Sequence, residues 1–160
     1  MFSASTDRRP FFSRQRIVAL VLVVAVLVIA ALWQRQHPFS IQTSTDIDAT
    51  PAEVWGVLTD YDAYPEWNPT QDGLEGATVV DTVPDKLLRW STSTGVVGIF
   101  DGERTFTLER LDGGGTRFSQ TGLFRGVVVP FVGASLTDDT APGFQAMNAA
   151  LRERVEAASR

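Results

Sequence analysis

The chain has 160 residues, enough for one domain of ordinary size and a terminal extension. Hydrophobic residues make up 44% of it and charged residues 21%, which excludes a disordered tail or a low-complexity array. It contains no cysteine and one histidine, His37. Disulfides, thiolate nucleophiles and metal sites built from cysteines or several histidines are therefore excluded, and we expect no metal or other cofactor.

The net charge of −5 is unevenly distributed along the chain. Residues 1–36 carry five arginines and one aspartate, whereas residues 37–160 carry nine basic and 18 acidic side chains. The second region therefore has a net charge of −9 and repels phosphate, so we expect no nucleic-acid partner.

Residues 17–33 contain no charged or polar side chain, glycine or proline, and as a helix they would measure roughly 25 Å. A hydrocarbon core is about 30 Å thick, so the run predicts a transmembrane helix between a basic tail, 1–16, and a linker, 34–38. Four arginines precede the run and one follows it, which predicts a cytoplasmic tail and an extracytoplasmic domain in a single-pass protein of the cell membrane. The alternative is a signal peptide that is cleaved near residues 28–30, followed by secretion.

The remaining residues, 39–160, begin with an alternation of apolar and polar side chains from Phe39 to Ile47 that predicts a strand. Thr50, Pro51 and Glu53 form a capping box that predicts a helix ending near Asp60. The segment 61–69 is rich in aromatic residues and interrupted by prolines, so it is expected to be a non-helical loop.

Five further strands are predicted between Ala77 and Phe124, and consecutive hairpins favour an antiparallel sheet. They cover residues 77–82, 87–91, 96–100, 103–111 and 116–124.

Turn residues separate these strands, and a long helix follows them. The turns are expected at Pro84-Asp85, at Asp101-Gly102 and at residues 112–115. An apolar loop is expected over 126–134, and the last helix is expected to begin at residues 140–142.

The segments Thr50–Trp55, Leu58–Asp60 and Tyr64–Pro69 resemble the opening of the SRPBCC superfamily, which includes START-related lipid-transfer domains and polyketide cyclase/dehydrase proteins. Later segments, such as Phe100–Glu103 and Gly143–Asn148, are similar to its last strands and final helix. The resemblance implies an α+β helix-grip fold over 39–160, in which a curved antiparallel sheet wraps around a long C-terminal helix. It also implies a ligand-binding domain, here preceded by the transmembrane helix.

One departure from the superfamily pattern concerns the sheet edge. Only 18 residues separate Pro69 from Leu88, where relatives have a full extra hairpin. A shortened edge implies a cavity that is smaller, open on one side, or closed by a partner or the bilayer.

A helix laid across a curved sheet leaves a space that large apolar side chains either fill as core or line as a ligand cavity. The candidates are Trp55, Trp67, Trp90, Phe106, Phe118, Phe124, Phe144 and Met147.

Catalysis would depend on carboxylates and arginines, because a nucleophile supported by histidine is unavailable. The candidates are Glu66 as a proton acceptor and Arg89 or Arg104 as a group that polarises a carbonyl. The alternative is that these side chains are surface charges. Residues Val128 and Phe131 in the apolar loop are candidates for a lid that admits ligand from the bilayer; alternatively, the loop folds against the core.

The sequence therefore predicts a membrane-anchored domain that binds or transports a hydrophobic small molecule or lipid. One alternative is a cofactor-independent enzyme of the cyclase/dehydrase type. Another is a scaffold or assembly module of a membrane complex, which would bind a protein partner in the same groove between the helix and the sheet.

Overall fold

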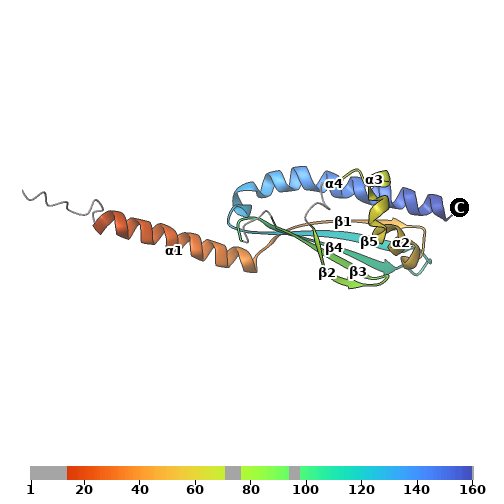
Figure 1. Cartoon of the computed structure of the whole chain (residues 1–160), viewed down its shortest axis with the longest axis horizontal. Helices are drawn as coiled ribbons and strands as arrows, with labels where there is room; N and C mark the ends of the chain where they lie inside the picture. Colours follow the sequence, from red (N-terminus) through yellow and green to blue (C-terminus); the bar gives the residue numbers. More distant parts are fainter. Residues whose placement is uncertain (1–13, 71–76, 94–97, 160) are drawn as a thin grey trace, which may run out of the picture.

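The computed structural model describes residues 14–70, 77–93 and 98–159. A long helix precedes the first strand, short helices separate that strand from the other four, and a second long helix follows the last strand (Figure 1). Their bounds are α1 Arg14–Gln36, β1 Phe39–Ile47, α2 Pro51–Thr59, the 3-10 helix η1 Tyr61–Ala63, α3 Tyr64–Trp67, β2 Thr78–Val83, β3 Leu87–Ser93, β4 Asp101–Arg110, β5 Thr116–Arg125 and α4 Val129–Ala158.

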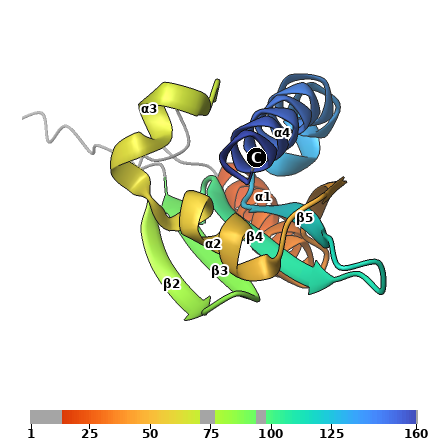
Figure 2. The ribbon, with the colours of Figure 1, turned by 90° about the vertical axis from the view of Figure 1, so that its right-hand side faces the viewer.

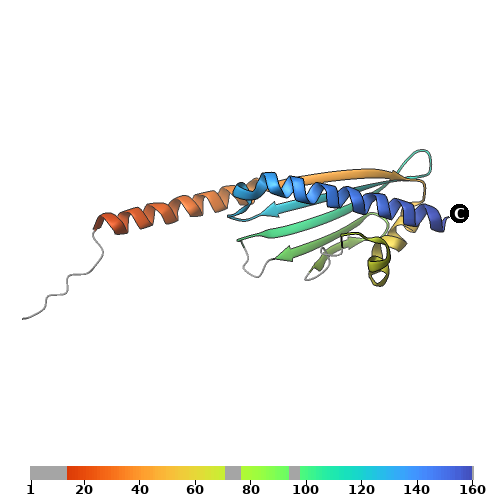
Figure 3. The same cartoon turned by 90° about the horizontal axis from the view of Figure 1, so that it is seen from above.

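The five strands form one antiparallel sheet in the order β1-β5-β4-β3-β2. Helix α4 lies along one face of this sheet, above β1 and β5 (Figures 2 and 3). The α+β architecture and the antiparallel hairpins predicted from the sequence are confirmed, and the arrangement is that of a helix-grip fold.

The face of the sheet that α4 covers is set by the two-residue period of the strands. On β5, alternate residues from Thr116 to Gly122 are buried, and on β4 the buried positions are Gly102, Phe106 and Leu108. The matching positions of α4 are Phe144, Met147, Leu151 and Val155, which are at most 2% exposed. Spacings of three and four residues put these four on one side of the helix, where they seal the core.

The predicted capping box starts α2. Glu53 accepts hydrogen bonds from the backbone N–H of Thr50 at 2.7 Å, and the Glu53 N–H donates to Thr50 Oγ1 at 3.4 Å. The Thr50 hydroxyl also donates to the Glu53 carboxylate at 2.7 Å. This bond and the one from the Thr50 backbone N–H lower the pKa of the Glu53 carboxyl, because they stabilise its charged form. The helix ends at Thr59, as the sequence predicts.

The last helix begins earlier than predicted. Residues 129–139, expected as the end of an apolar loop and its continuation, already belong to α4. Pro130 lies in the first turn, where its missing N–H has no partner to lose, and the helix continues through Pro142. Packing of the downstream apolar side chains against the sheet outweighs the one backbone hydrogen bond that Pro142 removes.

Two local predictions need correction. The segment 61–69 is not a plain loop, because η1 and α3 occupy residues 61–67. Asp101 and Gly102 are not a turn but the first residues of β4. Residues 98–100 form the turn, and the Asp101 carboxylate accepts a hydrogen bond from the Gly98 N–H at 2.7 Å. The predicted strand 96–100 otherwise begins outside the described residues.

Helix α1 contains the apolar run 17–33, and the large apolar side chains described on it are exposed. His37 stacks on Trp33 with ring centroids 4.5 Å apart, and Pro38 follows before β1 begins. Among the described residues, no helix qualifies by length and apolarity as one that could cross a membrane. The predicted transmembrane assignment of 17–33 is therefore not supported.

Gly122 is needed for the fit between the sheet and α4. A Cβ at this position would lie 2.9 Å from Cζ of Phe144. We expect Gly122→Ala to destabilise the protein by about 1–3 kcal/mol, because overpacking forces the Phe144 ring out of place. Urea unfolding of the full chain in a non-ionic detergent measures the change.

Gly56→Ala is the matched control, because Gly56 is exposed on α2 and a Cβ there meets no atom within 4 Å. It should stabilise the protein by about 0.5–1 kcal/mol. Equal effects of the two substitutions would contradict the packing described at Gly122.

Candidate functional site

Aromatic rings connect the helices after β1 to the covered face of the sheet. The Tyr64 ring lies 4.9 Å from that of Trp67 and 6.0 Å from that of Trp90. Trp90 contacts Phe106 edge-on at 5.0 Å, and Phe106 stacks on Phe118 at 5.8 Å. Such ring contacts add to the burial of apolar area, so this cluster fixes η1 and α3 over β3 and β4.

Tyr64 holds the cluster to the backbone. Its hydroxyl donates to the carbonyl oxygen of Leu58 at 2.6 Å, which ties α3 to the end of α2. Burial raises the pKa of this hydroxyl well above its usual range, so Tyr64 is protonated at all ordinary pH values.

A hollow of about 330 Å³ opens beside this cluster, and its described lining consists of Tyr61, Ala77, Val79 and Trp90. Val79 pairs with Trp90 in the β2–β3 ladder, and the Tyr61 ring lies 5.9 Å from that of Trp90. Most of this lining is apolar. The hollow can therefore accommodate an apolar group against the indole of Trp90.

Arg104 lies in the middle of the sheet, on the face that α4 covers. It pairs with Trp90 on one side and with Gly122 on the other. Its guanidinium carbon is 4.4 Å from the centroid of the Phe144 ring, and no carboxylate of the described residues forms an ion pair with it. Partial burial lowers the pKa of Arg104 to about 10, because it disfavours the charged form.

Two buried indole N–H groups of the aromatic cluster also lack an acceptor. Within the described residues, neither Trp67 Nε1 nor Trp90 Nε1 has a hydrogen-bond partner. A buried donor without a partner costs free energy, typically about 1–3 kcal/mol. The cluster therefore presents hydrogen-bond donors that the protein itself leaves unused.

A short polar chain crosses from β1 to β5 beneath α4. Asn148 donates to Thr43 Oγ1 at 3.0 Å and accepts from Gln120 Nε2 at 2.9 Å. The other atom of the Gln120 amide, Oε1, is buried without a partner among the described residues. These contacts hold α4 in register on the sheet.

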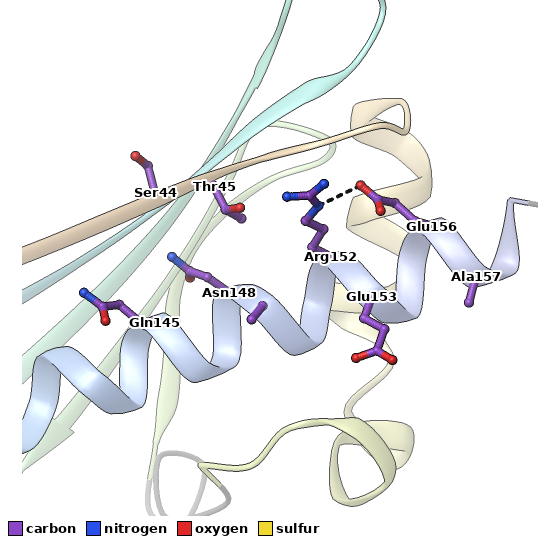
Figure 4. A pocket seen from close by; sticks show the side chains of 9 residues that line it. Ser44, Thr45, Gln145, Asn148, Arg152, Glu153, Glu156 and Ala157 are labelled. Atoms are coloured by element: carbon purple, nitrogen blue, oxygen red, sulfur yellow. Dashed lines mark hydrogen bonds and ion pairs between the residues drawn. The ribbon is translucent and has the colours of Figure 1, made fainter.

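A second hollow, of about 480 Å³, lies between the edge strand β1 and α4 (Figure 4). Its lining is polar and includes Ser44, Gln145 and Arg152, and Arg152 is paired with Glu156 at 2.9 Å. Seven of its nine described lining residues are polar or charged, and β1 is an edge strand. This groove suits a polar or peptide-like occupant better than an apolar one.

The predicted lining residues are divided between core and hollow. Among the eight, Trp90, Phe106, Phe118, Phe144 and Met147 are buried, whereas Trp55, Trp67 and Phe124 are half-buried. Of the eight, Trp90 is the one that belongs to the described lining of the apolar hollow. Tyr61, Ala77 and Val79 were not in the predicted lining set, although the alternation of residues 77 and 79 on one strand face was a usable signal.

The predicted catalytic candidates lie apart. Arg89 and Trp90 lie on opposite faces of β3. Arg89 pairs with Asp81 at 2.7 Å. Glu66 is exposed on α3 and pairs with Arg154 at 2.7 Å. Each is held in its own ion pair outside the hollow, whereas Arg104 is the arginine on the covered face.

The predicted lid residues lie at the start of α4. Val128 precedes the first residue of the helix, and Phe131 is 86% exposed. Metal-binding geometry is absent from the described residues, where no three acidic or histidine side chains come together.

Arg104→Met should raise the melting temperature at pH 7. The folded protein lowers the pKa of Arg104 to about 10, so it holds the charged guanidinium less favourably than the unfolded chain does. Removing the charge relieves this penalty below about pH 10, and methionine keeps a contact with Phe144. Above pH 10 wild-type Arg104 loses its proton in the folded state, so the melting temperatures of Arg104→Met and the wild type should move closer together.

Arg117→Met is the control, because Arg117 is exposed and its pair with Asp46 at 2.8 Å raises its pKa. Its melting temperature should stay the same or fall slightly. A lower melting temperature for Arg104→Met at pH 7 would show that the buried guanidinium stabilises the fold.

Comparison with known proteins places this architecture among described folds. Residues 38–86 match the model of the family described as polyketide cyclase / dehydrase and lipid transport. No curated protein matches the chain.

Three solved structures illustrate the similarity. A protein from Thermobifida fusca has a TM-score of 0.58 at 18% identity, covering 72% of this chain and 92% of its own. A START superfamily protein from Mycobacterium smegmatis has a TM-score of 0.52 at 19% identity, with coverage of 73% and 97%. The Zhui aromatase/cyclase from a Streptomyces species has a TM-score of 0.50 at 15% identity, with coverage of 78% and 97%. The matching family model agrees with the SRPBCC resemblance of the sequence, and these structures show that the chain has a START-like helix-grip fold.

Proposed function

We propose that this protein binds an apolar small molecule or lipid in the hollow beside Trp90. The observation that carries the proposal is the hollow of about 330 Å³, whose described lining is formed by Tyr61, Ala77, Val79 and Trp90. Its volume lies at the lower end of the range for ligand pockets, about 300–1,000 Å³. A small or partly enclosed apolar ligand suits it best.

The proposal includes attachment to a membrane through α1. The large apolar side chains described on this helix are exposed, Leu20 by 64% and Ile29 by 66%, for example. Each such side chain gains roughly 1.5–3 kcal/mol when it leaves water, so the helix needs an apolar cover. The arginines at its N-terminal side favour a cytoplasmic tail and an extracytoplasmic domain, with secretion after cleavage as the alternative.

An exposed apolar patch on the domain lies close to the end of α1. We call it the apolar tip; it consists of Ile99, Val127, Val128, Phe131 and Val132. Backbone hydrogen bonds from Val127 to Gly98 and from Val128 to Ile99 hold the tip together.

The tip is close to the start of β1, since a Cβ at Gly133 would lie 3.5 Å from the Phe39 ring. Only His37 and Pro38 separate α1 from β1, so a membrane that receives α1 also meets the tip (Figure 1). This placement supports a role for Val128 and Phe131 in admitting ligand from lipid.

The alternative of a cyclase/dehydrase-type enzyme has support from the description of the matching family and from the similarity to the Streptomyces aromatase/cyclase. Against it, Glu66 and Arg89 are ion-paired away from the hollow. Binding is therefore the function that the geometry supports better. The polar groove along β1 is the feature that favours a scaffold role.

Val79→Asp tests the hollow. Val79 is 45% exposed, so the substitution should leave the fold intact while placing a carboxylate where an apolar ligand must contact. We expect at least a tenfold loss of affinity for radiolabelled dodecanol, measured by equilibrium binding to the full chain in a non-ionic detergent with detergent alone as blank.

Val83→Asp is its matched control, because Val83 lies on the same strand at 44% exposure and outside the described lining of the hollow. It should bind dodecanol like the wild type. Equal binding by Val79→Asp and the wild type would overturn the proposed binding site.

Phe131→Ser tests the tip. Loss of this exposed ring should slow the transfer of pyrene from phosphatidylcholine vesicles to the protein, because less apolar surface meets the lipid. The decay of excimer fluorescence measures the rate, and Val83→Ser serves as the control. An unchanged rate with an unchanged melting temperature would remove the tip from the pathway of ligand entry.

A further inference from the structure

Arg104 is an unusual group to find beneath α4. Its side chain is half-buried, it packs on the Phe144 ring at 4.4 Å, and no described carboxylate pairs with it. Two other sheet arginines show the contrast, since Arg89 and Arg117 each pair with an aspartate at under 3 Å. The domain has an excess of acidic residues, yet none of those described reaches this cation.

The groups around Arg104 are donors as well. Trp90 is its cross-strand neighbour, so their Cβ atoms lie about 4.5–5.5 Å apart on the same face of the sheet. The indole N–H of Trp90 and that of Trp67 are buried without acceptors among the described residues. Guanidinium and indole nitrogens donate hydrogen bonds and accept none. Their complement is a group that only accepts, and an ionised carboxylate is such a group.

Two glycines flank Arg104 on the covered face. Gly122 is the partner of Arg104 on β5, and Gly102 lies two residues before it on β4. The Phe144 ring fills the space over Gly122, so the guanidinium lies between Phe144 and its cross-strand neighbour Trp90. The one buried acceptor left over among the described residues, Gln120 Oε1, is on the adjacent strand and could accept from Arg104 or from a ligand hydroxyl.

The apolar hollow begins on the other side of Trp90. Trp90 lines that hollow, contacts the Tyr64 ring at 6.0 Å and faces Arg104 across the ladder. Arg104 is outside the described lining of the hollow, but the register puts it directly beyond Trp90. The head of a molecule whose apolar body lies against Val79 reaches Arg104 when it extends past Trp90.

We propose that the ligand is an amphipathic carboxylate, with its anionic head held by Arg104 and the indole N–H of the neighbouring Trp90 and its apolar body in the hollow beside Trp90. This inference rests on the proposed function and adds the charge and polarity of the ligand to it. Arg104 then acts as the residue that selects acids over neutral molecules of the same length. A carboxylate bound to Arg104 would also raise the pKa of the guanidinium back toward its ordinary value, because a nearby negative charge favours the charged form.

The test compares dodecanoate with dodecanol, which share an apolar chain and differ at the head. Binding of each radiolabelled probe to the full chain is measured in a non-ionic detergent at pH 8, with detergent alone as blank. The wild type should bind dodecanoate at least tenfold more tightly than dodecanol. Arg104→Gln should lose this preference while keeping its affinity for dodecanol, and Arg104→Lys should retain part of it.

Arg89→Gln is the matched control, since it removes a sheet arginine from the opposite face and should leave both affinities unchanged. Circular dichroism confirms that each variant is folded. The comparison of the two probes on the wild type needs no variant, so it decides the question even where a substitution unfolds the chain.

Each outcome has a definite meaning. Equal affinity of the wild type for the two probes, or a preference for dodecanoate that survives in Arg104→Gln, overturns the assignment of Arg104 but leaves an apolar binding site in place. No binding of either probe overturns both the proposed function and this inference.

Discussion

The packing of α4 against the sheet is the interaction on which the other features depend. Phe144, Met147, Leu151 and Val155 form one side of the helix and meet the covered face of β4 and β5. The Phe144 ring fits against β5 because Gly122 has no side chain. Since the ring occupies this space, the guanidinium of Arg104 has an aromatic face to rest on instead of a carboxylate.

The hollow follows from where α4 does not reach. The helix packs mainly on β1 and β5, and β2 and β3 extend beyond it, where η1 and α3 take over as cover (Figure 3). Short helices cover less area than α4, and their contact with the sheet passes through the rings of Tyr61, Tyr64 and Trp90. An apolar surface that is only partly covered remains beside Trp90, which is the property that a ligand site requires.

Much of the fold could be predicted because local sequence patterns determine it. The alternation in β1 and the capping box at Thr50 each depend on neighbours in sequence, and both predictions are confirmed to the residue. The start of α4 could not be predicted from Pro142, because tertiary packing outweighs the local preference of proline. The site was harder still: Arg89 and Arg104 are the same residue type on adjacent strands, and only the register, which pairs Trp90 with Arg104, puts one inside and the other outside.

The placement of Arg104 opposes stability and serves recognition. A charge that burial shifts toward its neutral form weakens the fold, and two indole donors without acceptors add to that cost. The domain tolerates these groups because the α4 core and the Thr43–Asn148–Gln120 chain hold the sheet and helix together without them. Stability therefore resides on the β1–β5 side of the sheet, and the unsatisfied donors lie on the side where the hollow opens. A ligand that supplied an acceptor there would satisfy donors that the described residues leave without a partner.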